Sequence, residues 1–325
     1  MSGPLLKRRS GYSGGSMAPT IATQMLPFGE QAIAEAARLI LAGEPVAVPT
    51  ETVYGLAADA TNAGAVAKIY AAKGRPSFNP LIVHVPDLAA AERIGLFNDE
   101  ARGLAEAHWP GPLTLVVPLR TEAGIASIVT AGLPTVGIRV PAHPAMQAVL
   151  EACGRPLAAP SANASGRISP TRAEHVLKSL GGRIPLIIDG GASERGIEST
   201  IIAATGAGLR LLRRGPIAVP GATVSESDTI ESPGQLATHY APSKPLRLNA
   251  QDRRPDEFLI GFGAIEGDAN LSPSGNLVEA AAKLFDLLHR ADASDRAGIA
   301  IAPVPAEGLG AAINDRLKRA ATPEI

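Results

Sequence analysis

The sequence predicts an α/β protein of two domains, a larger one with a twisted mixed sheet and a small Rossmann-like one with a parallel sheet. Three observations predict it. The chain has 325 residues, more than one domain usually needs. Up to residue 213, short apolar runs alternate with helical periodicity and outnumber those of a simple βαβ repeat. Residues 221–245 then lose this periodicity, and residues 246–325 follow a strand–helix–strand–helix order.

The helices of the larger domain, residues 25–220, are predicted from apolar faces and end signals. In the first helix Ile33, Ala36 and Ile40 share a face, and Gly43 follows the end. A Pro-Thr pair suited to capping opens the last helix. The predicted helices are residues 31–42, 62–72, 99–107, 144–152 and 171–180. Bounded apolar runs predict strands at residues 45–49, 81–85, 113–119, 135–140, 157–159, 186–189, 199–203 and 209–213.

The remaining segments complete the expected organisation. Residues 1–24 carry basic residues and a Gly/Ser-rich piece, and we expect them to be disordered. Residues 221–245 form a linker far longer than a normal loop, with His239 and Tyr240 in a stretch expected to dock on the protein as a lid. In the C-terminal domain, strands are predicted at residues 258–263 and 298–302 and helices at residues 276–291 and 309–321.

Composition excludes several classes of protein. Lys and Arg number 30 against 31 Asp and Glu, so the chain lacks the basic balance of proteins that hold RNA by phosphate neutralisation. The single cysteine, Cys153, leaves no disulfide framework and no Cys-rich zinc site, and we expect no protein-held metal and a cytoplasmic location. No apolar run approaches the roughly 18 residues that span a membrane.

Two short motifs suggest an anion site. Lys73 and Arg75 flank a glycine that allows close backbone approach, and Pro76 stiffens the exit. Arg offers a fork of donors to phosphate oxygens, and Lys offers a point charge. Ser161 and Asn163 follow a buried strand, where α/β proteins place ligands. The plain alternatives are a solvated helix end and an ordinary turn, and neither motif taken alone excludes them.

Other polar residues interrupt apolar strands. His84 lies inside Leu-Ile-Val-His-Val, and a lone histidine there is usually structural. Arg139 between apolar residues needs a carboxylate, from either a protein acid or a bound ligand, and because no acid neighbours it in sequence the ligand is favoured. Thr52, Ser199 and Arg213 stand at strand ends. The chain has no Walker-type phosphate loop, no nucleophile elbow and no His-Glu-x-x-His zinc motif.

Five motifs in order resemble the Sua5/YrdC family of threonylcarbamoyl-AMP synthases. They are Pro-Thr-Glu-Thr-Val-Tyr-Gly-Leu at residues 49–56, Lys-Gly-Arg-Pro through Pro-Leu-Ile-Val-His at 73–84, Trp-Pro-Gly-Pro-Leu-Thr at 109–114, Gly-Ile-Arg-Val-Pro at 137–141 and Pro-Ser-Ala-Asn at 160–163. Residues 232–242 and 303–316 resemble the linker and C-terminal domain of the longer Sua5 branch. The resemblance covers about residues 25–323 and implies a YrdC-like fold for the larger domain.

The resemblance implies that L-threonine, bicarbonate and ATP, with Mg²⁺, give threonylcarbamoyl-AMP and pyrophosphate. The product would pass to the machinery that forms t6A at position 37 of tRNAs reading ANN codons. The resemblance is compatible with a weak direct contact with tRNA and implies no contact with a membrane. By motif matching, the residues implied to hold threonine are Thr52, His84, Arg139, Ser161 and Ser199. Those implied to hold ATP are Arg75, Asn79, Thr135, Asn163, Arg213 and Tyr240, and those implied to be catalytic are Lys73 and Arg75.

Three other kinds of protein contain a related domain and offer rival interpretations. The first is a double-stranded-RNA-binding module without catalysis, against which the near-neutral charge argues. The second is a carbamoyl-transfer enzyme of hydrogenase maturation, which has Cys-rich zinc fingers that one cysteine cannot build. The third is a YciO-like homologue, which lacks the linker around His239 and Tyr240.

Overall fold

A computed structural model gives the fold of residues 21–206, 208–224, 231–233 and 239–322. The larger domain is built on one mixed sheet of eleven described strands, in the order β1-β8-β2-β3-β7-β4-β6-β5-β9-β10-β11. In chain order they are β1 (Gln24–Pro27), β2 (Val46–Val48), β3 (Gly55–Asp59), β4 (Ile82–His84), β5 (Leu113–Pro118), β6 (Thr135–Arg139), β7 (Leu157–Ala158), β8 (Leu186–Asp189), β9 (Thr200–Ala204), β10 (Leu209–Arg213) and β11 (Thr223–Val224).

Helices cover both faces of this sheet. Successive residues of a strand point to opposite faces, and in β2 Val46 and Val48 enter one apolar core while Ala47 enters the other. The first core takes residues of α1 (Glu30–Leu41) and α6 (Pro144–Cys153). The second takes residues of α2 (Ala63–Lys73), α3 (Leu88–Glu92), α4 (Asp99–His108), α5 (Ser127–Thr130) and α7 (Ala173–Leu180). The predicted mixed α/β class is therefore confirmed.

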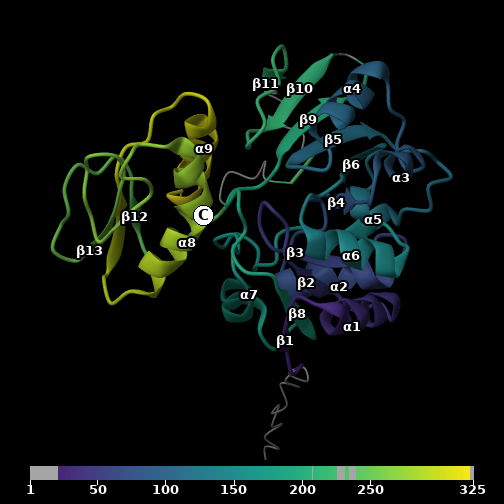
Figure 1. Cartoon of the computed structure of the whole chain (residues 1–325), viewed down its shortest axis with the longest axis horizontal. Helices are drawn as coiled ribbons and strands as arrows, with labels where there is room; N and C mark the ends of the chain where they lie inside the picture. Colours follow the sequence, from purple (N-terminus) through teal and green to yellow (C-terminus); the bar gives the residue numbers. More distant parts are fainter. Residues whose placement is uncertain (1–20, 207, 225–230, 234–238, 323–325) are drawn as a thin grey trace, which may run out of the picture.

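The C-terminal domain is a small parallel sheet backed by two helices. Its strands β12 (Leu246–Arg247), β13 (Glu257–Gly261), β14 (Ala269–Asn270) and β15 (Gly298–Ile301) pair in the order β12-β15-β13-β14, all parallel. Helices α8 (Leu277–Ala293) and α9 (Leu309–Ala320) lie between this sheet and the larger domain (Figure 1). Asn276 caps α8 by accepting from two backbone N–H groups. The predicted parallel-sheet domain is confirmed.

The two domains touch through backbone as well as side chains. Gly196 adopts a left-handed φ of 69°, and a Cβ built on it would lie 2.3 Å from the carbonyl oxygen of Ala281 in α8. Any larger residue would push the loop and the helix apart, so this close approach requires glycine. Across the described residues, no helix is both long enough and apolar enough to cross a membrane.

The structure differs from the expected elements in a few places. Arg172, not Thr171, is the N-cap residue of α7, and its side chain makes no capping hydrogen bond. Strand β3 was not predicted, because its small residues carry no alternation. Residues 21–24, expected to be disordered, hydrogen bond along residues 182–185, while residues 1–20 lie outside the described part. Strand β11 pairs with β10 from inside the expected linker, so the sheet continues beyond residue 220.

Candidate functional site

A cavity opens where the ends of β2, β4, β6 and β9 meet, and polar side chains from distant motifs line it. The side chains come from the turn after β2, the loop after β7, the strands themselves and the segment before β12. Eight of the residues implied by sequence line this cavity: Thr52, Arg75, His84, Arg139, Ser161, Ser199, Arg213 and Tyr240. Segments more than 180 residues apart in the chain thus contribute to one site.

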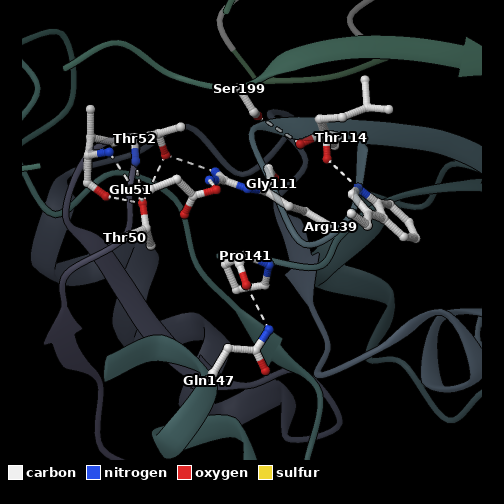
Figure 2. Close-up of polar contacts among 12 residues, drawn as sticks. Thr50, Glu51, Thr52, Gly111, Thr114, Arg139, Pro141, Gln147 and Ser199 are labelled. Atoms are coloured by element: carbon white, nitrogen blue, oxygen red, sulfur yellow. Dashed lines mark hydrogen bonds and ion pairs between the residues drawn. The ribbon is translucent and has the colours of Figure 1, made fainter. Parts of the chain in front are cut away.

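Arg139 is fixed from three sides (Figure 2). Its guanidinium donates from Nη2 to Glu51 Oε1 at 2.6 Å, from Nη1 to Thr52 Oγ1 at 2.9 Å and from Nε to the Gly111 carbonyl at 3.2 Å. Of the two sources of a carboxylate left open by the sequence, the protein acid is the one observed, although the sequence alone favours the ligand. Glu51 supplies one from a turn 88 residues away, which adjacency in sequence could not reveal.

Glu51 is held as a carboxylate. Burial alone would raise its pKa, but the charge of Arg139 and its hydrogen bond outweigh burial and lower the pKa of Glu51 below its ordinary value. Within the described residues the second carboxylate oxygen, Oε2, is buried without a hydrogen-bond partner. The turn is built locally, because Thr50 Oγ1 donates to the Val53 carbonyl at 2.6 Å and contacts Thr52 Oγ1 at 2.8 Å.

His84 faces the same end of the cavity as a neutral imidazole. Desolvation lowers its pKa to about 3, helped by the nearby charge of Arg139 and opposed by that of Glu51. Its Nδ1 is buried with no partner in the described part of the chain. A neutral imidazole with an unused nitrogen suits a polar ligand group better than it suits a core position. The purely structural interpretation of His84 therefore leaves that nitrogen unexplained.

Arg75 and Arg213 form the second cationic region of the cavity. Arg75 donates to the carbonyls of Asn79 at 3.3 Å and Pro80 at 3.1 Å. Arg213 donates to the carbonyl of Ser199 at 3.0 Å and to its hydroxyl at 2.9 Å. Desolvation lowers the pKa of each guanidinium to about 10. Neither has a carboxylate at ion-pair distance among the described residues.

Lys73 stands behind this region and not in the cavity wall. Its ammonium donates to the carbonyls of Ser161 at 2.6 Å and Asn163 at 2.5 Å, so it ties the loop after β7 to the end of α2. Complete burial lowers the pKa of Lys73 well below its ordinary value, and the charge of Arg75 lowers it further. The sequence motifs Lys-x-Arg and Ser-x-Asn are thus physically joined by this one side chain.

The other residues implied to hold ATP lie near the cavity without lining it. Asn79 and Asn163 are buried, and each has a side-chain oxygen with no partner among the described residues. Thr135 lines an adjoining cavity, which shares Ile82 and Pro233 with the first. Their contact with a nucleotide remains a prediction.

Tyr240 closes one side of the cavity from the segment before β12. It is almost fully buried, takes a left-handed φ of 65° and stacks on Phe285 of α8 with ring centroids 5.4 Å apart. His239 packs edge-on against its ring at 4.0 Å. This contact between the linker and both domains agrees with the expectation that the linker docks. Its core, residues 234–238, lies outside the described residues.

Three charged residues near the site are absent from the set that the motifs assign to the substrates. Glu51 stands inside the Pro-Thr-Glu-Thr motif, and Glu198 directly precedes Ser199, so the motifs contained a signal for both. Arg316 lies in α9, and only the docking of the two domains brings it to Glu198 at 3.0 Å. The described residues hold no group of three or more His, Cys, Asp or Glu side chains arranged to bind a metal ion.

Comparison with known proteins agrees with this geometry. A family model described as "Telomere recombination", covering Sua5, YciO and YrdC, matches residues 38–215. A second, described as "Threonylcarbamoyl-AMP synthase, C-terminal domain", matches residues 197–322. The chain belongs to the Sua5/YciO/YrdC family. The second match places it with the longer, Sua5-type members, and the similarity inferred from the sequence motifs is confirmed.

Relatives of full length share both domains of this Sua5-type architecture. A Bacillus subtilis protein named threonylcarbamoyl-AMP synthase is 40% identical over 92% of this chain and 95% of its own length. A Pyrococcus abyssi protein of the same name is 37% identical over 88% of this chain and 92% of its own. The crystal structure of P. abyssi Sua5 complexed with L-threonine matches with a TM-score of 0.84 and 35% identity, covering 92% of this chain and 97% of that one.

Proposed function

We propose that this chain is an L-threonylcarbamoyl-AMP synthase, an enzyme that converts L-threonine, bicarbonate and ATP into L-threonylcarbamoyl-AMP and pyrophosphate. Full-length relatives carry that name, and the solved relative binds L-threonine. The product serves t6A formation at position 37 of tRNAs reading ANN codons. The alternative of a double-stranded-RNA-binding module without catalysis is not favoured, because the polar groups converge on one cavity, as a small-molecule site requires.

One observation carries the proposal: the cavity has an internally neutral half and a cationic half. In the first half Arg139 is paired with Glu51, and His84 is uncharged. A net-neutral site suits an amino acid, whose own charges balance. In the second half Arg75 and Arg213 have no carboxylate partner within the described part of the chain, and buried cations in that state need an anion. A triphosphate beside an amino acid meets both requirements.

The reaction follows from these two halves. Bicarbonate takes up one proton and loses water to give CO₂. The neutral amine of threonine attacks this CO₂, a C–N bond forms, and the proton that the amine gives up passes to solvent, which balances the proton taken up by bicarbonate. A carbamate oxygen then attacks the α-phosphorus of ATP, an O–P bond forms, and the bond to the β-phosphate breaks so that pyrophosphate leaves. Phosphoryl-type transfer needs positioning and charge neutralisation more than a protein nucleophile. The cations and hydroxyls of this cavity supply both.

Individual roles are assigned by position. Arg139 has two guanidinium N–H bonds not used by Glu51, Thr52 or Gly111, and we assign them to the threonine carboxylate. His84 receives a polar group of threonine on Nδ1, and Thr52 and Ser199 border the same ligand. Ser161 stands between the halves. Arg75 and Arg213 hold phosphate oxygens, with Asn79, Thr135, Asn163 and Tyr240 around the nucleotide.

Lys73 contributes in two ways. Two of its three ammonium N–H bonds hold the carbonyls of the Ser161–Asn163 loop, which fixes that loop against Arg75. Its charge, behind the phosphate region and beside Arg75, offsets negative charge that develops near the α-phosphate. Mg²⁺ would be carried by ATP next to Arg75 and Arg213 and would supply further charge neutralisation for the leaving pyrophosphate. We place the reaction in the cytoplasm, where the tRNA threonylcarbamoyl-transfer machinery would take the product.

The test is a pyrophosphate-release assay on the full chain, in which threonine and bicarbonate are omitted in turn. Release that requires both substrates together with ATP and Mg²⁺ is the expected result. Mass spectrometry of the product should show an adenylate that contains threonine and one added carboxyl carbon. Pyrophosphate release that is indifferent to threonine, or none with all substrates present, would overturn the proposal.

A further inference from the structure

We propose that Arg316, in the C-terminal domain, is a positioning residue that fixes one wall of the substrate cavity in the larger domain. The inference builds on the proposed function and assigns a task to a domain that, among the described residues, contributes no charged side chain to the cavity lining. Arg316 acts through Glu198, Arg214 and Tyr240 and contacts no reacting atom itself.

The contacts of Arg316 converge on the cavity from behind. Its Nε donates to Glu198 Oε2 at 3.0 Å, and its Nη1 donates to the Arg214 carbonyl at 2.7 Å. Its guanidinium carbon lies 5.6 Å from the centre of the Tyr240 ring. Glu198 and Tyr240 both line the cavity. One side chain therefore holds parts of the wall that come from two strand ends and the linker.

The held residues are direct neighbours of the residues assigned to the substrates. Glu198 precedes Ser199, and Arg214 follows Arg213. Ser199 and Arg213 are bonded to each other across the start of β9 and the end of β10. Arg316 thus clamps both outer ends of this pair. Because a shift of one residue moves its chain neighbour, loosening Arg316 displaces a threonine contact and a phosphate contact together.

The charge of Arg316 is compensated by the residues around it. Arg316 is completely buried, yet its charge is compensated by Glu198 and by Asp315 at 3.1 Å. The other oxygen of Glu198 accepts from Ser169 Oγ at 2.5 Å, so the carboxylate is held on both sides. Desolvation opposes the charge of Arg316, but Tyr240 and the two carboxylates outweigh it and raise its pKa above the ordinary value.

The packing around Glu198 leaves little freedom for adjustment. A Cβ added to Gly215 would lie 2.3 Å from the Thr200 backbone nitrogen and 2.8 Å from the Glu198 carbonyl oxygen. The two strand ends therefore run in backbone contact at this point. Arg316 of the C-terminal domain hydrogen bonds to both strand ends here, at Glu198 and at the Arg214 carbonyl. The position of this wall therefore depends on both domains.

A second interdomain ion pair provides a matched control. Arg172 in the larger domain bonds Asp286 of α8 at 2.7 Å, as Arg316 bonds Glu198 across the same interface. The side chain of Arg172 is 48% exposed, and it lines no part of the cavity. A variant at Arg172 removes an interdomain charge pair without touching the wall. The Arg172 variant therefore shows how much activity and binding are lost through weaker domain docking alone, without displacement of the cavity wall.

The experiment compares Arg316→Ala, Arg316→Lys and Arg172→Ala in the full chain. We expect kcat/KM for threonine to fall about 100-fold in Arg316→Ala, the scale of a misplacement of about 1 Å. Arg316→Lys keeps the charge but lacks the fork that reaches Glu198 and Arg214 together, so it should recover only part of the rate. Arg172→Ala should keep the wild-type rate. Circular dichroism and melting temperature establish that each variant is folded.

Calorimetric titration with L-threonine and with inorganic pyrophosphate gives a readout that does not need turnover. Weaker binding of both in the Arg316 variants, with unchanged binding in Arg172→Ala, supports the inference even if the wild type releases no pyrophosphate from ATP. That last result would overturn only the proposed function. If Arg316→Ala does not fold, Arg316→Lys decides. Wild-type rate and binding in Arg316→Lys, or equal losses in the Arg316 and Arg172 variants, would overturn the inference.

Discussion

The two halves of the cavity bury their arginines in different ways. Arg139 lies against a carboxylate, a hydroxyl and a carbonyl, with Glu51 at 2.6 Å. Arg75 and Arg213 are also buried, but their described partners are carbonyls and a hydroxyl. Glu198, whose charge also reaches Arg213, is ion-paired with Arg316. The first half is balanced within the protein and the second carries excess positive charge.

This difference indicates what each half is made to receive. A buried charge without a partner is costly, and a protein keeps one where a ligand supplies the compensation. A half that is already neutral gains nothing from an isolated anion and suits a ligand whose charges cancel. Charge balance within the pocket, rather than the number of arginines, therefore separates an amino-acid subsite from a polyphosphate subsite.

The largest effect is expected from Arg139→Ala. The change leaves Glu51 buried without its partner, which should lower the free energy of unfolding by about 3–5 kcal/mol and abolish threonine-dependent turnover. Chemical unfolding and the pyrophosphate assay measure the two parts. Removing the carboxylate as well, in Arg139→Ala with Glu51→Ala, should restore part of the stability and none of the activity. If Arg139→Ala alone were as stable as the wild type, Glu51 would not depend on Arg139 for charge compensation, and the contrast between the two halves would fail.

Arg75→Ala should separate activity from stability. We expect kcat to fall about 10²–10³-fold, the cost of losing one donor to a transition-state oxygen, while stability falls less than in Arg139→Ala because no carboxylate loses a partner. Thermal shifts with ligand test the division directly. Pyrophosphate should raise the melting temperature of Arg139→Ala but not of Arg75→Ala, and L-threonine should do the reverse. Identical shifts in both variants would show that the halves are not distinct.

Glu51→Gln converts the neutral half into a second cationic one. Arg139 keeps a hydrogen-bond partner but loses its counter-charge, so stability should fall by about 1–3 kcal/mol. The KM for threonine should rise about tenfold, equal to about 1.4 kcal/mol, because Arg139 is less firmly placed. Steady-state kinetics measure it. Tighter threonine binding in this variant would mean that Glu51 competes with the ligand for Arg139.

The smallest effect is a change in pH dependence at His84. Its folded-state pKa is about 3, whereas an unfolded histidine titrates near 6.5, so below pH 6.5 only the unfolded state takes up this proton. Stability therefore falls with falling pH through this window, by about 1.4 kcal/mol per pH unit. In His84→Gln that contribution is absent. As the pH falls from 6.5 to 5, the wild type should therefore lose more stability than the variant does. A difference independent of pH would contradict a neutral His84.

Much of the fold was predictable because its signals are local. Strands such as β4 and β5 lie in short, mostly apolar runs, and α1 and α8 show one apolar face with an end signal, as in Gly43 and Asn276. Strand β3 and the pairing of β11 had no such signal, because small residues and a two-residue strand carry no period. Their partners in the sheet, not their own sequences, determine them.

The sequence by itself determined the chemical inventory: which cations, hydroxyls and amides stand at the strand ends, and which family their order matches. Only the tertiary structure decided how their charges are compensated. Glu51 meets Arg139 across 88 residues, Lys73 reaches the loop at Asn163, and Arg316 reaches Glu198 from another domain. The interaction between two charges weakens with the distance between them in space. That distance cannot be read from the number of residues that separate the two charges along the chain.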